Sequence, residues 1–198
     1  MTATGAIEVG EETVRTFICI EIPETIKGRI DSLQHELRRL GAQVSWTRPS
    51  NIHLTIKFLG DVPATRIEDV KGAVERATAG RTAFEIEVGG TGCFPAPRNP
   101  RVLWVGLTSI PIPLRELHSA IESELAREGF PREEKRFSPH LTIGRVRNPQ
   151  NAGRLAEELI RRGIESESFR AGEIIVMRSD LNPSGSIYTP LAATRLDG

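Results

Sequence analysis

Apolar residues recur along this chain with two periods, one typical of strands and one typical of helices. Residues 15–22 are rich in β-branched and aromatic residues and end before Pro23, which predicts a strand. Apolar residues from Ile26 to Leu40 then recur at steps of three and four, which predicts one face of a helix that ends at Gly41. The first half is completed by a strand at 53–59, a helix that carries Ile67, Val70 and Val74, and a strand at 84–88.

The second half of the chain repeats this order of elements at nearly the same spacing. The tetrapeptide His-Leu-Thr-Ile occurs at His53–Ile56 and again at His140–Ile143. Arg15 precedes His53 by 38 positions, and Arg101 precedes His140 by 39. A strand–helix–strand–helix–strand unit is therefore used twice. The repeated elements are a strand at 101–107, a helix that carries Leu114, Leu117, Ile121 and Leu125, a strand at 140–146, a helix around Leu155 and Leu159, and a strand at 172–177, with a last short strand near Tyr188.

Two fold classes are compatible with this alternation of strands and helices, a doubly wound parallel sheet and an α+β fold. We expect the α+β class: a two-lobed, duplicated fold with mainly antiparallel sheets around a central cleft and helices on the outside. Two like halves that face each other across a cleft bring their equivalent strands together. Residues 1–13 are expected to form a flexible tail. Residues 14–198 are expected to form one bilobal catalytic domain, with a first half at about 14–90 and a second at about 100–180.

The repeated motif presents polar side chains on one face of a strand. Because side chains alternate along a strand, His53 and Thr55 point the same way, and so do His140 and Thr142. If the halves meet about a pseudo-two-fold axis, two imidazoles and two hydroxyls surround one point. The apolar residues Leu54, Ile56 and Phe58 of the first motif, and Leu141 and Ile143 of the second, are expected to point into the core.

Two imidazoles and two hydroxyls suit the chemistry of a phosphodiester. A neutral imidazole can take a proton from water that attacks phosphorus, and a protonated one can give a proton to the departing oxygen, since the unperturbed pKa of histidine is about 6.5. Threonine hydroxyls can donate to the non-bridging oxygens, whose charge grows in the transition state. No HExxH, Cys-x-x-Cys or Asp-rich cluster surrounds either histidine, so we expect no metal and no cofactor.

Longer stretches around both motifs match one family pattern: Arg15-Thr-Phe-Ile, Trp46-Thr-Arg-Pro, His53-Leu-Thr-Ile-Lys-Phe-Leu-Gly, Phe94-Pro, Pro100-Arg-Val-Leu-Trp-Val-Gly, Phe137-Ser-Pro-His-Leu-Thr-Ile-Gly-Arg-Val, and Ser179-Asp-Leu with Tyr188. With these residues the chain resembles the 2H phosphoesterases over nearly its whole length. Within them it resembles the bacterial and archaeal RNA 2′,3′-cyclic phosphodiesterases, historically called 2′-5′ RNA ligases.

The resemblance implies hydrolysis of a 2′,3′-cyclic phosphate, at the end of an RNA or oligonucleotide, to a 2′-phosphomonoester. It implies that His53 donates a proton to the leaving oxygen and that His140 accepts one from water. It also implies that Thr55 and Thr142 hold the phosphate.

Two further residues are candidates for substrate binding. Arg145, five positions after His140, matches a family arginine near the phosphate. Strict alternation puts it on the opposite face from His140, so this role requires the strand to end or bulge near Gly144. Phe17 shares a face with Arg15 and is a candidate for stacking on a base, with core packing as the alternative.

Other residues have structural interpretations. His35 and His118 lie in amphipathic helices among charged neighbours, and a structural or surface role is expected for both. Lys57 shares the face of His53 and is interpreted as a solvated lysine at a strand end. Cys19 and Cys93 are expected to be two buried reduced thiols.

Charge and composition limit the class of partner. The 26 basic and 26 acidic residues cancel, which argues against broad non-specific binding of nucleic acid, and no DNA binding is expected. The first residues lack a positive start and an apolar run, so no signal peptide is expected. No window is apolar over the length that a membrane-spanning helix needs. We expect a cytoplasmic monomer that does not associate with membranes.

Two alternative functions keep the same motifs. By microscopic reversibility with cleavage of a 2′-5′ linkage, the histidines could catalyse the joining of a 5′-hydroxyl to a cyclic phosphate in such a linkage. No P-loop or adenylation motif is present, so such joining does not depend on ATP. The other alternative is a non-catalytic module that binds phosphorylated RNA ends, for which Arg or Lys suits better than His.

Overall fold

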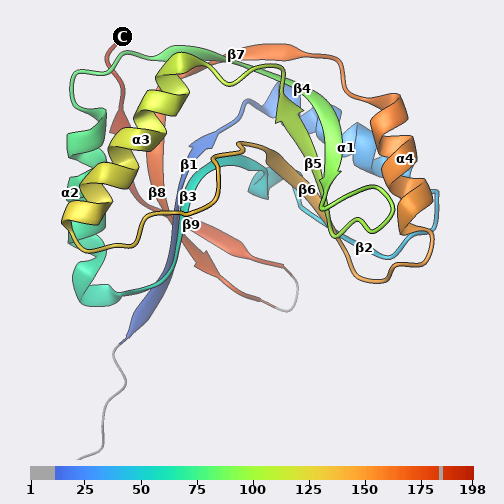
Figure 1. Ribbon diagram of the computed structural model, residues 1–198, viewed down its shortest axis with the longest axis horizontal. Coiled ribbons are helices and arrows are strands. Elements are labelled where there is room, and N and C mark those ends of the chain that lie inside the picture. The colour runs from blue at the N-terminus through green and yellow to red at the C-terminus, as the bar shows by residue number, and fades with distance from the viewer. Residues whose placement is uncertain (1–11, 183–184) are drawn as a thin grey trace, which may run out of the picture.

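One curled sheet with helices at both ends forms the protein (Figure 1). The computed structural model describes residues 12–182 and 185–198. Most of the tail expected at 1–13 lies outside these residues, and Thr13 opens the first strand. The strands are β1 (Thr13–Glu21), β2 (Val44–Trp46), β3 (His53–Pro63), β4 (Phe84–Phe94), β5 (Val102–Leu107), β6 (Leu141–Val146), β7 (Glu167–Ala171), β8 (Glu173–Asp180) and β9 (Ile187–Arg195).

The sheet is antiparallel in each pairing between its named strands, as the α+β prediction requires. The strand order is β7-β4-β5-β6-β3-β1-β8-β9, and β2 pairs with β6 at the side. This order is symmetric about the junction of β6 and β3, because equivalent strands of the two sequence repeats lie at equal distances from it. The two histidine motifs therefore meet at the centre of the sheet.

Each lobe contains strands from both sequence halves. β4, the last strand of the first repeat, lies beside β5 of the second, and β8, the last strand of the second repeat, lies beside β1 of the first. The lobes therefore do not coincide with the sequence halves 14–90 and 100–180. The exchange ties the two repeats together, since neither lobe is complete without a strand from the other half.

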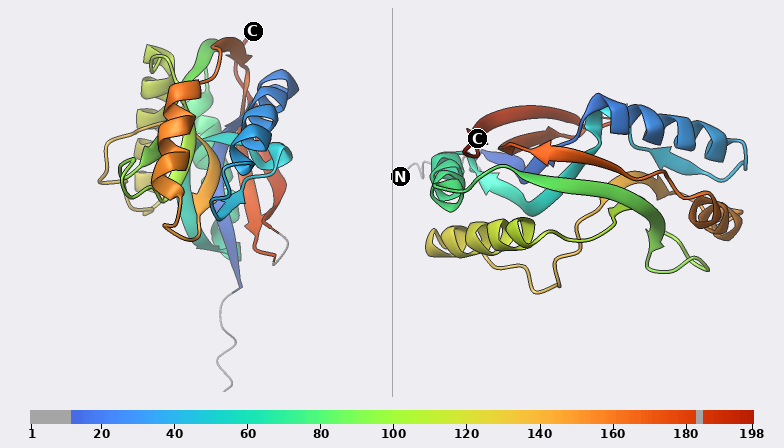
Figure 2. Two further views of the ribbon diagram at one scale, coloured as in Figure 1. Left: turned by 90° about the vertical axis from the view of Figure 1, so that its right-hand side faces the viewer. Right: turned by 90° about the horizontal axis from the view of Figure 1, so that it is seen from above.

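In the part of the chain that the structure describes, four α-helices cover the two ends of the sheet (Figure 2). The helices α1 (Glu24–Arg38) and α4 (Ala152–Arg162) lie at one end, and α2 (Ile67–Thr78) and α3 (Ile112–Arg127) pack together at the other. α1 buries Ile26, Ile30, Leu33 and Leu37, the face that the periodicity predicted. Gly41, at φ 72°, follows in the left-handed conformation that favours glycine. Two short 3₁₀ turns, Pro49–Asn51 and Ala64–Arg66, precede β3 and α2.

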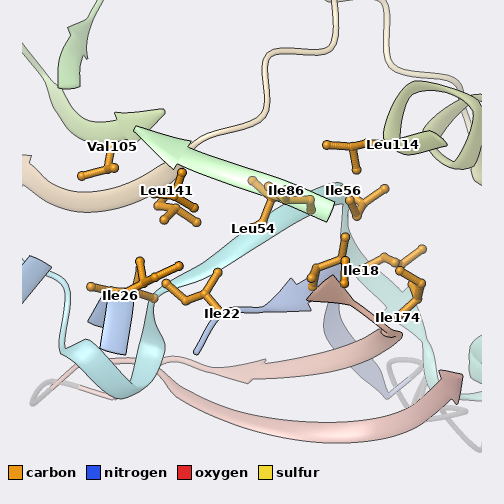
Figure 3. Close-up of a cluster of buried hydrophobic side chains, with 14 of the residues drawn as sticks. Ile18, Ile22, Ile26, Leu54, Ile56, Ile86, Val105, Leu114, Leu141 and Ile174 are labelled. Carbon is orange, nitrogen blue, oxygen red and sulfur yellow. The ribbon is translucent and has the colours of Figure 1, made fainter. Parts of the chain in front are cut away.

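A continuous apolar core runs through both lobes (Figure 3). Leu54 and Leu141 face each other across the β3–β6 junction and are fully buried. Ile56 and Ile143 are buried as well, as predicted. Full burial of each such side chain contributes about 1.5–3 kcal/mol, so the back of each histidine motif is firmly anchored.

Each histidine motif contains a β-bulge at the same position, its last residue. In β3 the pairing with β1 skips Ile56, and in β6 the pairing with β5 skips Ile143. Each bulged residue is the third after the motif's histidine. Because a bulge shifts the alternation by one residue, the side chains that follow it change face, in β3 as far as a second bulge at Leu59.

The bulge in β3 reverses two expectations. Phe58 was expected in the core, but 49% of its surface is exposed. Lys57 was expected to be solvated, but it is only 6% exposed, and its Nζ lies 2.6 Å from Glu122 Oε1. Both predictions were wrong for the same reason, since they extended strict alternation through the extra residue at Ile56.

Candidate active site

The register of β3 and β6 brings the two motifs together on one face. Leu54 pairs with Leu141, so His53 lies opposite Thr142, and Thr55 lies opposite His140. These four side chains point away from the core face that the two leucines occupy. The two histidines are diagonal neighbours in this register, for which the typical separation is about 7–8 Å. One phosphate group fits between side chains at that spacing.

The motifs line a cleft with two arms. The first arm, which contains His53, has a volume of about 420 Å³, and the second, which contains His140, has about 540 Å³. The first arm also holds Phe17. Four residues line both arms and therefore mark where they meet: Thr55, Phe58, Thr142 and Arg145.

Each histidine ring is tethered in the same way. Nδ1 of His53 lies 2.9 Å from the carbonyl oxygen of Asn51, and Nδ1 of His140 lies 2.8 Å from that of Ser138. A carbonyl oxygen only accepts hydrogen bonds, so Nδ1 carries a hydrogen in both rings. Nε2 is then the atom that takes up or releases a proton. In both motifs, therefore, the histidine Nδ1 is held by the carbonyl oxygen of the residue two positions earlier.

Aromatic rings surround His53. Its ring stacks on Phe17, with ring centroids 4.6 Å apart and planes at 21°, and the ring of Tyr188 meets both edge-on. Burial among these rings lowers the pKa of His53 from 6.5 to about 4, although its hydrogen bond to the Asn51 carbonyl acts in the opposite direction. In the empty cleft at neutral pH, His53 is therefore a neutral imidazole.

His140 has a different environment. Phe94 meets its ring edge-on with centroids 5.1 Å apart, and Trp104 lies at 6.5 Å. Burial lowers the pKa of His140 below its usual value, the bond to the Ser138 carbonyl opposes this effect, and the nearby charge of Arg145 adds to it. A neutral His140 is able to accept a proton at Nε2.

Arg145 reaches the cleft because of the bulge at Ile143. The side chain is exposed and lines both arms. The bulge that its predicted role required is present, one residue before Gly144. The carbonyl oxygen of Ile143 accepts hydrogen bonds from the Thr47 backbone N–H at 3.0 Å and from Gln34 Nε2 at 2.8 Å, which hold the bulge in place.

Phe17 lies in the first arm but has little surface left for a ligand. It is only 3% exposed, because His53, Tyr188 and the side chains of Cys19 and Met177 pack around it. The structure therefore presents Phe17 as a support for the His53 ring.

Several residues of the first arm were not identified as site residues from the sequence. Tyr188 comes from the hairpin of β8 and β9, which also supplies Ser179, Leu181 and Ser186 to the first arm. Asn51 Nδ2 donates to the Ser186 carbonyl at 2.7 Å and ties this hairpin to the His53 segment. Phe58 was assigned to the core. The strands predicted at 172–177 and near Tyr188, and the match of Ser179-Asp-Leu and Tyr188 to the family pattern, signalled this hairpin in advance.

The remaining histidines have structural surroundings. His35 is exposed on α1, outside both arms. His118 lies in the second arm, where it stacks on Phe137 with centroids 3.9 Å apart and has Nε2 3.8 Å from Glu122. Burial lowers the pKa of His118.

The structure also describes the environment of both cysteines. Cys19 and Cys93 are buried free thiols, as expected, and burial raises the pKa of Cys19 to about 12. Within residues 12–182 and 185–198, no cluster of three or more His, Cys, Asp or Glu side chains is placed to hold a metal ion. None of the helices there is long and apolar enough to cross a membrane.

Comparison with known proteins agrees with the duplication. The LigT-like phosphoesterase family model matches residues 20–104 and again residues 105–188. The RNA 2′,3′-cyclic phosphodiesterase of Methanothermobacter thermautotrophicus is 37% identical over 92% of this chain and 99% of its own length. The protein of that name from Thermotoga maritima is 33% identical over 93% and 97%.

Solved structures share the fold. The crystal structure of the protein TT0787 of Thermus thermophilus has a TM-score of 0.77, covers 93% of this chain and 98% of its own, and is 23% identical. The two matches to one family model meet within β5 and agree with the paired motifs and the symmetric sheet. The chain belongs to the LigT-like phosphoesterases of the 2H superfamily.

Proposed function

We propose that this protein hydrolyses 2′,3′-cyclic phosphate ends of RNA to 2′-phosphomonoesters by two-histidine acid/base catalysis that needs no metal. One observation carries the proposal. The two motif histidines have the same Nδ1 tether, which makes Nε2 the titrating atom of both, and they line one cleft beside Thr55, Thr142 and Arg145. Relatives that span nearly the whole chain are named RNA 2′,3′-cyclic phosphodiesterase.

The proposed reaction is a single displacement at phosphorus. His140 Nε2 takes a proton from water as the water oxygen bonds to phosphorus. The bond from phosphorus to the 3′ oxygen breaks, and His53 Nε2 gives that oxygen its proton. Thr55, Thr142 and Arg145 stabilise the non-bridging oxygens as their charge grows. The product carries a 2′-phosphate and a 3′-hydroxyl, and proton exchange with solvent restores both histidines.

In this scheme, substrate binding converts His53 to the protonated form that can act as the proton donor. His53 is neutral in the empty cleft, because burial lowers its pKa to about 4, whereas a donor must be protonated. An anionic phosphodiester beside Nε2 favours the imidazolium form and raises the pKa. His53 therefore takes up a proton as the cyclic phosphate binds. His140 needs no such change, because it starts as the neutral acceptor.

Phe17 acts as a positioning residue in this proposal. Its ring covers one face of the His53 imidazole, so it keeps Nε2 directed at the leaving oxygen. Removing that ring changes turnover more than substrate affinity, because the ring has little exposed surface of its own.

The decisive experiment uses purified protein with EDTA and an RNA oligonucleotide that ends in a 2′,3′-cyclic phosphate. We expect turnover by the wild type, and a loss of at least about a hundredfold in both His53→Ala and His140→Ala. His35→Ala is the matched control, because it removes an exposed imidazole outside the cleft. Full activity in both motif variants, or a requirement for added metal, contradicts the proposal. Tight product binding without turnover supports the binding module instead.

RNA, and not DNA, is the proposed partner. A 2′,3′-cyclic phosphate requires the 2′-hydroxyl, which DNA lacks.

We also propose that the protein is a monomer, since one chain supplies both histidines. We propose a cytoplasmic location, since the buried free thiols of Cys19 and Cys93 fit a reducing compartment.

End joining is a second candidate, supported by the size of the His140 arm. Its volume of about 540 Å³ is far larger than one water molecule needs, so the arm has room for the 5′-hydroxyl end of a second strand. The same groups then catalyse the same ring-opening displacement, with a 5′-oxygen in place of water: His140 takes the proton of the 5′-hydroxyl, and His53 gives its proton to the 3′ oxygen. Product analysis with excess 5′-hydroxyl RNA distinguishes the two reactions.

A further inference from the structure

We propose that His118, on helix α3, is a positioning residue for His140, the proton acceptor. The proposal rests on the proposed function and extends it to a residue that acts through other residues. The ring of His118 holds the ring of Phe137, and Phe137 places Ser138, the next residue. The carbonyl oxygen of Ser138 in turn holds Nδ1 of His140.

The segment that leads to His140 has little structure of its own. Residues 131–136 are all exposed. Residues 132–139 make no backbone–backbone hydrogen bond within the part of the chain that the structure describes. Side chains must therefore place this segment, and Phe137 is the first residue along it whose side chain is not exposed.

The Phe137 ring is held by a stack with His118. The ring centroids are 3.9 Å apart and the planes lie at 15°, so the two rings cover each other face to face. Both side chains line the second arm of the cleft. His118 lies in the middle of α3, which packs against α2. The stack therefore ties an otherwise exposed segment to a fixed helix.

The link from Phe137 to His140 is short. Ser138 directly follows Phe137, and its carbonyl oxygen lies 2.8 Å from His140 Nδ1. A shift of the Phe137 ring moves Ser138 and turns this oxygen away from Nδ1. Without that acceptor the imidazole is free to adopt its other neutral tautomer, in which Nε2 carries the hydrogen. In that tautomer Nε2 cannot accept a proton from water.

The surroundings of His118 favour a neutral ring. Its Nε2 lies 3.8 Å from Oε1 of Glu122, one helical turn further on, and the same oxygen is 2.6 Å from Lys57 Nζ. Burial lowers the pKa of His118, Glu122 opposes this effect, and Lys57 adds to it. A neutral imidazole stacks on Phe137 without the cost of burying a charge.

The first test compares two substitutions of His118 in the assay with a cyclic phosphate end. His118→Leu removes the flat ring, and kcat is expected to fall at least about tenfold with little change in KM, because the acceptor is misplaced while the phosphate site is kept. His118→Phe is expected to keep most of the wild-type rate, since its ring can stack in the same place. His35→Leu is the matched control, because His35 is exposed on α1 outside both arms.

The second test does not depend on turnover. Long-range ¹H–¹⁵N NMR spectra of the ligand-free protein show which ring nitrogen of each histidine carries the hydrogen. The His140 signals are assigned by their absence from His140→Ala. At mildly alkaline pH, where the imidazoles are neutral, we expect the Nδ1–H form of His140 in the wild type and in His118→Phe. In His118→Leu we expect the Nε2–H form to appear.

A third variant breaks the same stack from the other side. Phe137→Leu is expected to lower kcat and change the His140 tautomer as His118→Leu does, and it carries the test if His118→Leu does not fold. The double variant His118→Leu/Phe137→Leu is expected to lose no more activity than either single variant, because both remove one contact. Losses that multiply contradict the link.

The outcomes separate this role from simple packing and from the proposed reaction. If His140 keeps its Nδ1–H form in His118→Leu, or if His118→Phe loses as much activity as His118→Leu, the positioning role is refuted. A change of tautomer that depends on the stack supports the role even if the wild type opens no cyclic phosphate. In that case only the proposed hydrolysis fails.

Discussion

Lys57 and Glu122 form a buried ion pair between the His53 strand and helix α3, with Nζ 2.6 Å from Oε1. Both side chains are less than a tenth exposed. Lys57 Nζ also donates to the Pro131 carbonyl at 2.9 Å, and Glu122 accepts from the Glu133 backbone N–H at 3.2 Å. The pair therefore fixes the start of the loop that leads to Ser138 and His140. This link between residues 65 positions apart in sequence connects the strand of the first motif to the segment that precedes the second.

Breaking this pair on one side is expected to destabilise the protein strongly. Lys57→Met leaves the Glu122 carboxylate buried without its partner, and the free energy of unfolding is expected to fall by about 3–5 kcal/mol. The double variant Lys57→Met/Glu122→Leu is expected to recover most of the loss, because no charge is then left buried. Urea unfolding of the wild type, the single variant and the double variant measures these free energies. Lys71→Met, which breaks an exposed pair with Glu68, is the control and should cost no more than about 1 kcal/mol. Equal effects of the buried and exposed changes contradict this account.

Loss of the Phe17 ring is expected to change the titration of His53. In Phe17→Leu the stacked face of the imidazole opens to water, so the pKa of His53 should rise from about 4 toward 6.5. We also expect kcat to fall while KM changes little. NMR titration of the imidazole C–H signals gives the pKa. Phe94→Leu is the matched control, since Phe94 contacts His140 and should leave the His53 titration in place. An unchanged pKa of His53 in Phe17→Leu contradicts the assignment of Phe17 as the support of the His53 ring.

The direction of both histidine shifts sets the pH dependence of kcat/KM. Burial lowers both pKa values, to about 4 for His53 and below 6.5 for His140. His53 must be protonated and His140 neutral in the proposed mechanism. Above both values His140 is already neutral, and each further pH unit removes about nine-tenths of the protonated His53. kcat/KM is therefore expected to fall about tenfold per unit between pH 7 and 8.5. Initial rates at substrate concentrations well below KM test this, and a flat profile over that range rules out the assigned protonation states.

Local pattern in the sequence predicted the features that depend on near neighbours. The alternation around His53 and Thr55 placed both on one face, and the spacing of Ile26, Ile30 and Leu37 predicted helix α1. The repeated tetrapeptide predicted the shared cleft, because equivalent strands of a duplicated fold meet at its axis. These inferences needed only the period of a strand or helix and the order of the elements.

The features that the sequence analysis missed depend on pairing between residues that are far apart in the chain. The bulge at Ile56 depends on the register with β1, and no residue within β3 marks it. The exchange of β4 and β8 between lobes likewise follows from pairing across the repeat boundary. β7 (Glu167–Ala171) was missed because it is a short strand with exposed polar residues. Lys57 looked solvated because Glu122, its partner, lies on a helix far along the chain.

The bulge in β6 can be tested at Gly144, the residue that follows it. A Cβ at this position lies 2.7 Å from Val44 Cγ1, closer than van der Waals contact allows, so Gly144→Ala must displace β2 or β6. Arg145 is the next residue, and its guanidinium would move away from the phosphate site. We expect kcat/KM to fall by at least tenfold, with KM for the cyclic phosphate rising.

A second substitution separates this displacement from general loss of stability. Val44→Ala removes the methyl group that the new Cβ meets, so Gly144→Ala/Val44→Ala is expected to recover part of the lost activity. Gly172→Ala is the control, because nothing lies within 4 Å of a Cβ there. If Gly144→Ala is as active as wild type, the position of Arg145 does not depend on the bulge, and its approach to the phosphate must have another cause. If activity falls and Val44→Ala restores it, the bulge is what turns the fifth residue after His140 toward the substrate.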